Sequence, residues 1–369
     1  MAGRIVLFGA TGFTGELTAR ALAARGERPV LAARNEARAR ALADELGGLE
    51  VAVADVARPQ SVAALVEAGD VLVSTVGPFA RWGDAAVRAA IGAGAHYLDS
   101  TGETPFIRAV FDRYGPEAER AGCGLVTAFG YDWVPGNLAG ALALREAGEA
   151  AVRVEIGYFI TGAGAGGMSG GTRASAAGVM LEPAFAWRGG RLVTERPGAR
   201  LRSFEVRPGK EWSGISLGTS EHYALPRLAP GLRDVDVYLG WFGPFSRGVQ
   251  AVAAASSVLV RLPGAKSGIE AVVGRLVQGS SGGPDADARA RAGSVVVAEA
   301  LDPGGATRAR VRLEGVNGYD FTAGMLAWGA AAAARGDLQG TGALGPVDGF
   351  GLDALEAGAA EAGIARADG

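Results

Sequence analysis

The stretch "IVLFGATGFTGELTARALAARG" (5–26) constrains the fold more than any other part of the chain. It joins a short apolar run to a helical pattern through three glycines, Gly9, Gly12 and Gly15. In such a turn the first glycine permits the tight bend, the second lets a pyrophosphate approach the backbone, and the third lets the helix pack on the strand. The N–H groups at the start of the helix then face the phosphates. The pattern predicts a dinucleotide-binding unit; a tight turn that binds nothing is the alternative.

The rest of the first 130 residues repeats this alternation of apolar runs and helical patterns. The predicted strands are 5–8, 30–33, 51–54, 71–76, 97–99 and 124–129. Their apolar residues are continuous instead of alternating, which is typical of a parallel sheet covered on both faces. The sequence therefore predicts an α/β fold that begins with a Rossmann-type doubly wound parallel sheet.

The pattern changes near residue 150. Alternating strands are predicted at 152–160, 233–241 and 307–316, and such strands have one buried and one wetter face, as in an antiparallel sheet. We expect an NADP-binding domain at 1–130 and a substrate-binding, catalytic α+β domain with a mainly antiparallel sheet at 131–319. The helical segment 320–369 is expected to pack back on the first domain.

Composition argues against nucleic-acid binding and against a membrane span. The chain has 369 residues and a net charge of -3, so it offers no basic footprint for nucleic acid. Cys123 is the only cysteine and precedes an apolar run, so we expect a small core residue; no metal-ligand spacing is found. The most lipid-like stretch, 251–262, is too short to span a bilayer, and no signal-peptide pattern opens the chain. We expect a cytoplasmic protein.

Arg34 indicates which dinucleotide is bound. It ends the second predicted strand, 19 residues after Gly15, where NAD-binding chains carry an acidic residue that holds a free ribose hydroxyl. A guanidinium instead pairs with a 2′-phosphate through two hydrogen bonds. Arg38, one helical turn on, adds positive charge. The sequence predicts NADP(H); a solvated surface arginine is the alternative.

The carboxyl ends of the next strands should complete the cofactor site. Asp55 and Val56 close the third strand, where a side chain commonly meets the adenine, and the Gly-Pro of 74–79 would keep the backbone close to the ribose and nicotinamide. A tight turn without function is the alternative for 74–79. The predicted cofactor contacts are Gly9, Thr11, Gly12, Phe13, Thr14, Gly15, Arg34, Asn35, Asp55, Val56, Thr75, Val76, Gly77, Pro78 and Phe79.

Candidate proton donors lie at the same edge of the sheet. No tyrosine is followed by a lysine four residues later, and no Ser-His-Asp arrangement is suggested. Asp99 and Glu103 follow the fifth strand, and Tyr131 and Asp132 follow the sixth. A carboxylic acid in an apolar cleft can keep its proton near neutral pH and donate it. The alternative is that Asp99 or Asp132 only caps the following helix.

Four motifs in this order resemble the saccharopine dehydrogenase-like reductases: "GATGFTG", "STVGPFARWG", "YLDSTGE" and "GYDWVPGN". The stretches "MSGGTRASA" (168–176) and "GYDFTAGMLAWGAAAA" with "GALGPVDGFG" near the end resemble the trans-acting enoyl reductase branch. Members of that branch work alongside polyketide synthases in secondary metabolism and reduce a carbon–carbon double bond in an acyl chain. The resemblance implies the same reaction here, with an acyl-thioester or other small-molecule substrate. Whether a carrier protein presents it, and whether the chain forms a homodimer, are left open.

The resemblance also implies a substrate site at Ser169, Gly170, Thr172 and Arg173. A Gly-rich helix cap with a surface arginine is the alternative. The segment 238–245 with the apolar helix after it could line an acyl pocket, or could be ordinary core or a dimer contact.

The chain departs from the family near the expected substrate pocket. Tyr131-Asp132-Trp133 replaces Phe-Asp-Ser, Gly136-Asn137 replaces Ser-Asp, and 345–348 replaces Leu-Thr-Pro, so the substrate can differ even where hydride transfer is kept. Three functions follow: an NADPH-dependent reductase of an activated C=C bond, a C=N reductase, or a module that senses NADPH without turnover.

Overall fold

The computed structural model describes residues 3–162, 184–240 and 282–367. The contacts of the chain separate into two units. Unit 1 comprises residues 1–101, 106–134 and 318–363, and unit 2 comprises residues 102–105, 135–317 and 364–369.

The sheet of unit 1 has seven parallel strands in the order β15-β6-β5-β4-β1-β2-β3. Its strands are β1 (Ile5–Phe8), β2 (Val30–Ala33), β3 (Val51–Val53), β4 (Val71–Ser74), β5 (His96–Asp99), β6 (Gly124–Val126) and β15 (Gly342–Ala343). Every residue of β1, β2 and β4 is buried, which explains why their sequences do not alternate. The predicted Rossmann-type sheet is confirmed, and each of the first six strands was expected within three residues of its observed ends.

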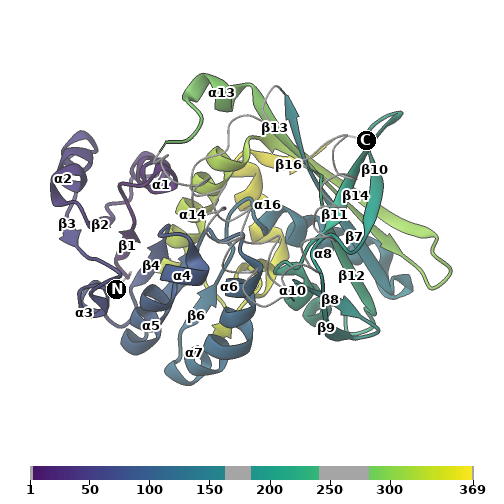
Figure 1. The fold of residues 1–369 in the computed structure, drawn as a ribbon, viewed down its shortest axis with the longest axis horizontal. Helices are drawn as coiled ribbons and strands as arrows, with labels where there is room; N and C mark the ends of the chain where they lie inside the picture. The colour runs from purple at the N-terminus through teal and green to yellow at the C-terminus, as the bar shows by residue number, and fades with distance from the viewer. Residues whose placement is uncertain (1–2, 163–183, 241–281, 368–369) are drawn as a thin grey trace, which may run out of the picture. The chain divides into compact units, whose positions relative to one another are not determined.

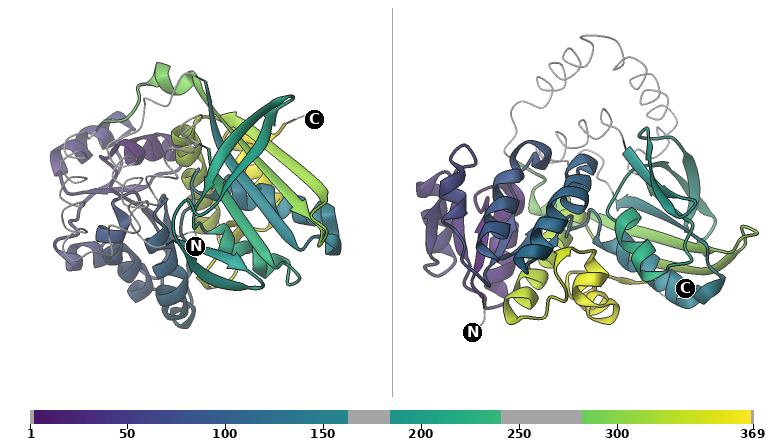
Figure 2. Two further views of the ribbon diagram at one scale, coloured as in Figure 1. Left: turned by 45° about the vertical axis from the view of Figure 1, so that its right-hand side comes forward. Right: turned by 90° about the horizontal axis from the view of Figure 1, so that it is seen from below.

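Helices cover both faces of this sheet. Helix α14 (Gly318–Arg335) and helix α5 (Asp84–Ala93) each contact β4 and β5, from opposite faces, and α14 also packs along α1 (Phe13–Ala24) (Figures 1 and 2). The other helices of the unit are α2 (Glu36–Glu45), α3 (Pro59–Ala63), α4 (Phe79–Trp82), α6 (Thr104–Ala109), which begins in unit 2, η1 (Val110–Tyr114), α7 (Gly115–Ala121), α15 (Pro346–Phe350) and α16 (Leu352–Glu361). As expected, Cys123 is buried just before β6.

The sheet of unit 2 is mainly antiparallel, as predicted, with one parallel pair between β7 (Arg153–Gly162) and β12 (Asp234–Leu239). Its main path runs β10-β11-β12-β7-β13-β14-β16. The remaining strands are β8 (Ala184–Arg188), β9 (Arg191–Glu195), β10 (Leu201–Arg207), β11 (Lys210–Ser216), β13 (Ala292–Leu301), β14 (Thr307–Val316) and β16 (Ile364–Arg366). Its helices are α8 (Val134–Ala147), η2 (Gly148–Ala150), α10 (Glu221–Leu228) and α13 (Ala286–Ala290).

Strand β7 differs from the expectation of one wet face. Residues 154–159 are buried on both sides of the strand. The side expected to be wetter carries Phe159, which joins a core cluster with Phe204, Val206, Tyr238, Val295 and Val297, with Trp212 packed against it. Phe204 and Trp212 come from the β10–β11 hairpin, so this hairpin covers the second face.

The last 50 residues divide between the units. Residues 318–363 belong to unit 1, where β15 adds a seventh strand beside β6. Strand β16 instead pairs with β14 and so adds the last strand to the sheet of unit 2. Its first residue, Ile364, is fully buried there. Over the described ranges, no helix combines the length and the apolar character needed to cross a membrane.

Candidate functional site

The glycine turn of unit 1 has the geometry of a phosphate-binding loop. Gly9 has φ +93°, and a side chain there would meet Thr75 Oγ1 at 2.7 Å. A Cβ on Gly15 would overlap the carbonyl oxygen of Gly9, so only glycine allows α1 to start this close to β1. Gly12 is exposed, and as the N-cap of α1 it lacks a side-chain hydrogen bond to the helix. The N–H of Gly12 itself donates to the carbonyl oxygen of Gly9 at 2.9 Å, so an anion would be bound by the N–H groups at the start of α1.

Arg34 is exposed immediately after β2. Within the described parts of the chain, no hydrogen bond or ion pair engages its guanidinium, which is therefore available to a phosphate. Arg38 is engaged: its Nη2 donates to the carbonyl oxygen of Thr11 at 3.0 Å and lies 3.3 Å from Glu16 Oε1. The side chain of Asn35 caps α2 by accepting from the N–H of Arg38 at 3.0 Å.

The other predicted cofactor segments are shaped by local hydrogen bonds. Asp55 Oδ1 accepts from the N–H of Ala57 at 3.0 Å, which closes a short turn after β3. Thr75 binds back to β1 through its N–H, which donates to the carbonyl oxygen of Phe8 at 2.9 Å. The ring of Phe79 is buried and packs against Phe106, so Phe79 can meet a cofactor only through its backbone. The assignment of 74–79 to the cofactor site stays a prediction.

Asp99 is fully buried and holds the chain after β6. Its carboxylate accepts hydrogen bonds from the N–H of Thr101 at 2.9 Å, the N–H of Ala128 at 2.8 Å and the hydroxyl of Thr127 at 2.8 Å. Burial raises the pKa of Asp99 to about 6, against the opposing effect of these hydrogen bonds. This network gives Asp99 a structural task, and a catalytic one stays a prediction.

Asp132 is differently placed. It is half-buried, its Oδ1 is enclosed, and that oxygen accepts no hydrogen bond from the residues that the structure describes. Burial raises the pKa of the Asp132 carboxyl to about 7. Hydrogen bonds fix its neighbours, from the N–H of Trp133 to the carbonyl oxygen of Ala128 at 2.8 Å and from the N–H of Tyr131 to Thr322 Oγ1 at 3.0 Å. Asp132 can therefore carry and release a proton near neutral pH.

The four candidate proton donors do not all belong to one unit. Asp99, Tyr131 and Asp132 are part of unit 1, whereas Glu103 is part of unit 2. Glu103 is buried, and the hydroxyl of the next residue, Thr104, donates to the carbonyl oxygen of Gly218 at 2.7 Å.

A buried polar cluster in unit 2 was not predicted. The Tyr158 hydroxyl donates to Glu221 Oε1 at 2.7 Å and accepts from the N–H of Gly136 at 2.7 Å. Both Tyr158 and Glu221 are fully buried, and a Cβ on Gly136 would overlap the Tyr158 hydroxyl. Asn137 Nδ2 donates to Ser220 Oγ at 3.0 Å. Gly136 and Asn137, two of the positions at which this chain departs from the resembling family, therefore contact residues more than 20 positions away. The polar run at 218–222 is the sequence feature that could have indicated this cluster.

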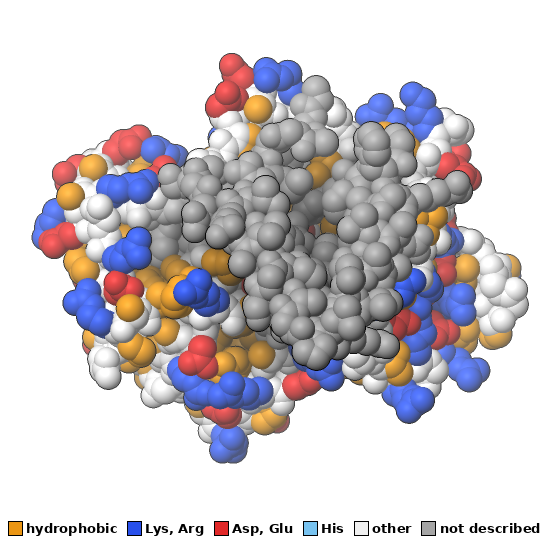
Figure 3. All heavy atoms as spheres, in the orientation of Figure 1, with side chains coloured by type: hydrophobic (Ala, Val, Ile, Leu, Met, Phe, Trp, Pro, Cys, Tyr) orange, Lys and Arg blue, Asp and Glu red, His pale blue; other side chains and the backbone are white. Residues whose placement is uncertain are grey.

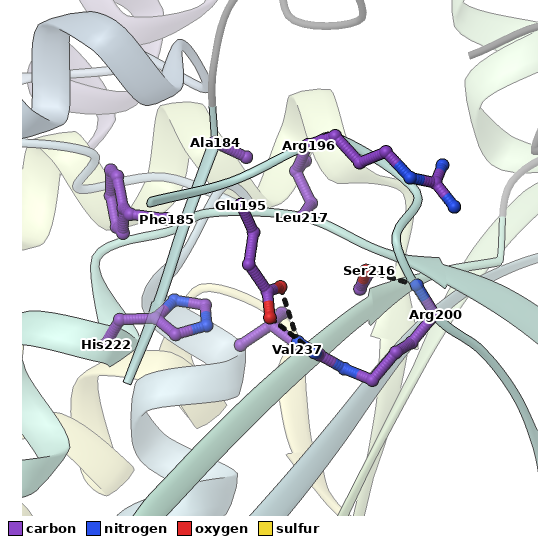
Figure 4. A pocket seen from close by; sticks show the side chains of 9 residues that line it. All are labelled: Ala184, Phe185, Glu195, Arg196, Arg200, Ser216, Leu217, His222 and Val237. Carbon is purple, nitrogen blue, oxygen red and sulfur yellow. Dashed lines mark hydrogen bonds and ion pairs between the residues drawn. The ribbon is translucent and has the colours of Figure 1, made fainter. Parts of the chain in front are cut away.

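The described pocket in Figure 4 lies within unit 2. Its lining is Ala184, Phe185, Glu195, Arg196, Arg200, Ser216, Leu217, His222 and Val237. Arg200 bonds Glu195 at 2.5 and 2.7 Å and Asp236 at 2.9 Å, so the central charges are already paired. Burial lowers the pKa of His222 to about 4, which keeps its imidazole neutral. This pocket holds none of the predicted site residues.

Charge is distributed without a single-sign patch on the face shown in Figure 3. Basic and acidic side chains are interspersed over its described part. The predicted substrate residues Ser169, Gly170, Thr172 and Arg173, and most of 238–245, lie outside the described residues.

Comparison with known proteins defines the class of unit 1. Residues 5–126 match the family model of the saccharopine dehydrogenase NADP binding domain. These residues therefore form a domain of that family, and the predicted NADP(H) cofactor is confirmed. The glycine turn, the open start of α1 and the exposed Arg34 fit this cofactor.

Curated relatives identify a narrower resemblance. A trans-acting enoyl reductase of Mycobacterium ulcerans (strain Agy99) is 41% identical over 140 residues, which are 36% of this chain and 34% of that protein. A curated relative from Mycobacterium tuberculosis (strain ATCC 25618 / H37Rv) is 39% identical over 186 residues, which are 48% of this chain and 43% of that protein. The chain thus spans between about a third and under half of the length of these relatives. The resemblance to trans-acting enoyl reductases is confirmed over these parts.

A solved structure shares the fold. Apo histidine-tagged saccharopine dehydrogenase (L-Glu forming) from Saccharomyces cerevisiae matches with a TM-score of 0.59 and 16% identity, over 96% of this chain and 96% of that one. At this identity the likeness concerns the fold alone.

Proposed function

We propose that this protein is an NADPH-dependent reductase that transfers hydride to an activated C=C bond conjugated to a carbonyl. The observation that carries the proposal is the combination, in one unit, of an NADP-binding domain with Asp132, a half-buried carboxyl whose pKa is raised to about 7. Asp132 follows β6, and the glycine turn follows β1. Because all strands of this sheet are parallel, both segments leave it at the carboxyl edge, where ligands bind in such folds.

The functional residues of unit 1 each have a defined role in this proposal. Bound NADPH supplies the hydride. The glycine turn and the first N–H groups of α1 hold the pyrophosphate, and Arg34 pairs with the 2′-phosphate. Hydride addition at the β carbon of an enoyl group leaves an enolate, and the protonated carboxyl of Asp132 donates its proton to the α carbon. The resulting carboxylate regains a proton from water.

The substrate is an acyl thioester presented by a carrier protein. This part of the proposal rests on relatives named trans-acting enoyl reductase, since a trans-acting enzyme receives its substrate from another protein. We infer that residues 169–173 contribute to the acyl site, as the resemblance implies.

Isotope transfer tests the proposal. NADPH deuterated at C4 is offered with a panel of α,β-unsaturated thioesters and cyclic imines, and mass spectrometry locates the label. Deuterium at a β carbon is the expected result, with loss of most turnover in Asp132→Asn and full turnover in Asp44→Asn, the same change at an exposed position. Label on a former imine carbon would instead establish C=N reduction. No label with any substrate, despite tight NADPH binding, would contradict the reductase and favour the sensor.

A further inference from the structure

The first two turns of α14 contact two functional segments of unit 1. Tyr319 packs edge-on against Phe13 of the glycine turn, with ring centroids 5.1 Å apart. Thr322, one turn later, contacts the segment 130–133 that carries Asp132. These contacts come from a part of the chain almost 200 residues beyond Asp132, and neither Tyr319 nor Thr322 belongs to the predicted site.

The Thr322 hydroxyl both donates and accepts a hydrogen bond. It donates to the carbonyl oxygen of Gly318 at 2.7 Å, and it accepts from the N–H of Tyr131 at 3.0 Å. A hydroxyl has one proton to donate and two lone pairs, so both bonds form at once. The bond to Gly318 orients the oxygen, and the bond from Tyr131 fixes the peptide next to Asp132.

Close packing on both sides reinforces this bond. A Cβ on Gly130 would lie 2.7 Å from Thr322 Cγ2, and a Cβ on Gly318 would lie 3.0 Å from the Tyr131 ring. The Tyr131 ring also meets Phe321 edge-on, with centroids 6.4 Å apart. Two glycines thus let the turn and the helix pack closely on either side of this hydrogen bond.

We propose that Thr322 is a positioning residue whose hydroxyl holds the Asp132 turn against α14, so that the carboxyl stays enclosed and correctly aimed. Its effect on turnover rests on the proposed function, in which Asp132 donates the proton. Its effect on Asp132 itself does not, because the hydrogen bond and the packing belong to the folded chain without substrate.

The titratable groups on the two segments are few. The turn carries Tyr131 and Asp132, and the first turn of α14 carries Tyr319 and Asp320. Asp99 binds the turn from the β5 side through the N–H of Ala128. Burial is the cause of the raised pKa of Asp132, so loosening the turn should return that pKa toward its ordinary value.

Carboxyl ¹³C NMR of the full chain tests this without any substrate, with the Asp132 signal assigned by its loss in Asp132→Asn. In Thr322→Val the pKa of Asp132 should fall by about one unit or more. Thr322→Ser, which keeps the hydroxyl, should retain the wild-type pKa. Thr18→Val is the matched control, because the Thr18 hydroxyl also donates to the carbonyl four residues earlier, at 2.8 Å, but accepts no N–H from another segment in the described parts of the chain. An unchanged pKa in folded Thr322→Val would overturn the proposal.

Two further measurements keep the outcome decisive. If the valine variant does not fold, Thr322→Ala can replace it, because alanine relieves the crowding beside Gly130. The pKa of Asp132 should fall in this variant too, and an unchanged pKa would again overturn the proposal. If Thr322→Val shifts the pKa of Asp132 but the wild-type protein reduces no enoyl thioester, the proposed function fails and the positioning role stands. If wild-type kcat declines with a pKa near 7 but Thr322→Val shows the same profile, the positioning role fails and the proposed function stands.

Discussion

Asp132 and Arg34 owe their properties to opposite environments. Oδ1 of the half-buried Asp132 is enclosed, and burial makes the charged form of its carboxyl unfavourable. Arg34 is exposed and forms no ion pair within the described residues, so its charge faces solvent or a ligand. The first residue suits proton donation, and the second suits recognition of a phosphate.

The raised pKa of Asp132 predicts a pH-dependent loss of stability. An aspartate has a pKa of about 3.9 when unfolded, and the folded value is about 7. The folded state therefore binds the proton more tightly, and its contribution to stability is full below pH 4 and is lost as the pH rises to 7. Asp132→Asn should raise the free energy of unfolding by roughly 1–2 kcal/mol at pH 8 and by less at pH 5.5.

Urea denaturation of both proteins at the two pH values measures this difference. Asp99, whose pKa is also raised, titrates in both proteins, so the comparison isolates Asp132. An equal effect at both pH values would show that the carboxyl is ionised in the fold throughout.

Arg34 is expected to determine the choice between NADPH and NADH. Arg34→Ala should weaken NADPH binding by about 10- to 100-fold, the loss of one charged hydrogen-bonding partner. NADH binding should change little, because it lacks the 2′-phosphate. Cofactor fluorescence titration measures both constants, with Arg40→Ala as the control, since Arg40 already pairs with Glu36 on the same helix. Equal losses for the two cofactors would rule out the phosphate contact.

At the scale of elements, the β1–α1 turn and the start of α14 carry the site. The turn depends on glycines at fixed positions, whereas α14 depends on contacts with Phe13 and Tyr131 from distant parts of the chain. The function of the β1–α1 turn can therefore be predicted from the sequence, whereas that of α14 cannot.

The close approach of α1 to β1 predicts a large effect of one methyl group. Gly15→Ala should destabilise the protein and abolish NADPH binding, because the added Cβ overlaps the carbonyl oxygen of Gly9. Gly92→Ala in α5 is the matched control: a Cβ there meets nothing within 4 Å, and alanine should stabilise the helix by about 0.5–1 kcal/mol. Thermal melts and NADPH titration compare the two. Normal cofactor binding by Gly15→Ala would refute the tight turn.

At the scale of the whole molecule, the chain passes between its two units more than once. It leaves unit 1 after residue 134, returns at 318 and ends in unit 2 with β16. Sequence order therefore does not correspond to the division of the fold.

Strand β16 should stabilise unit 2 without serving the cofactor. Ile364 is fully buried and lies opposite Gly315 of β14. Ile364→Ala should cost about 2–5 kcal/mol, and Ile364→Val about 0.5–1.5 kcal/mol. Hydrogen exchange should accelerate in β14 more than in β1, while the NADPH dissociation constant stays unchanged. Faster exchange confined to β1 would contradict this assignment of β16.

Local patterns determined the Rossmann-type sheet and its cofactor turn. Continuous apolar runs predicted six strands, and the spacing of Gly9, Gly12 and Gly15 predicted the turn, because each signal lies within a few neighbouring residues. The two-residue strand β15 is too short to produce such a signal. The tertiary structure alone decided the burial of both faces of β7, the Tyr158–Glu221 pair and the hydrogen bond from Tyr131 to Thr322 beside Asp132. Each depends on side chains from distant segments, the β10–β11 hairpin, α10 and α14 among them, and burial by distant segments leaves no periodic mark in the local sequence.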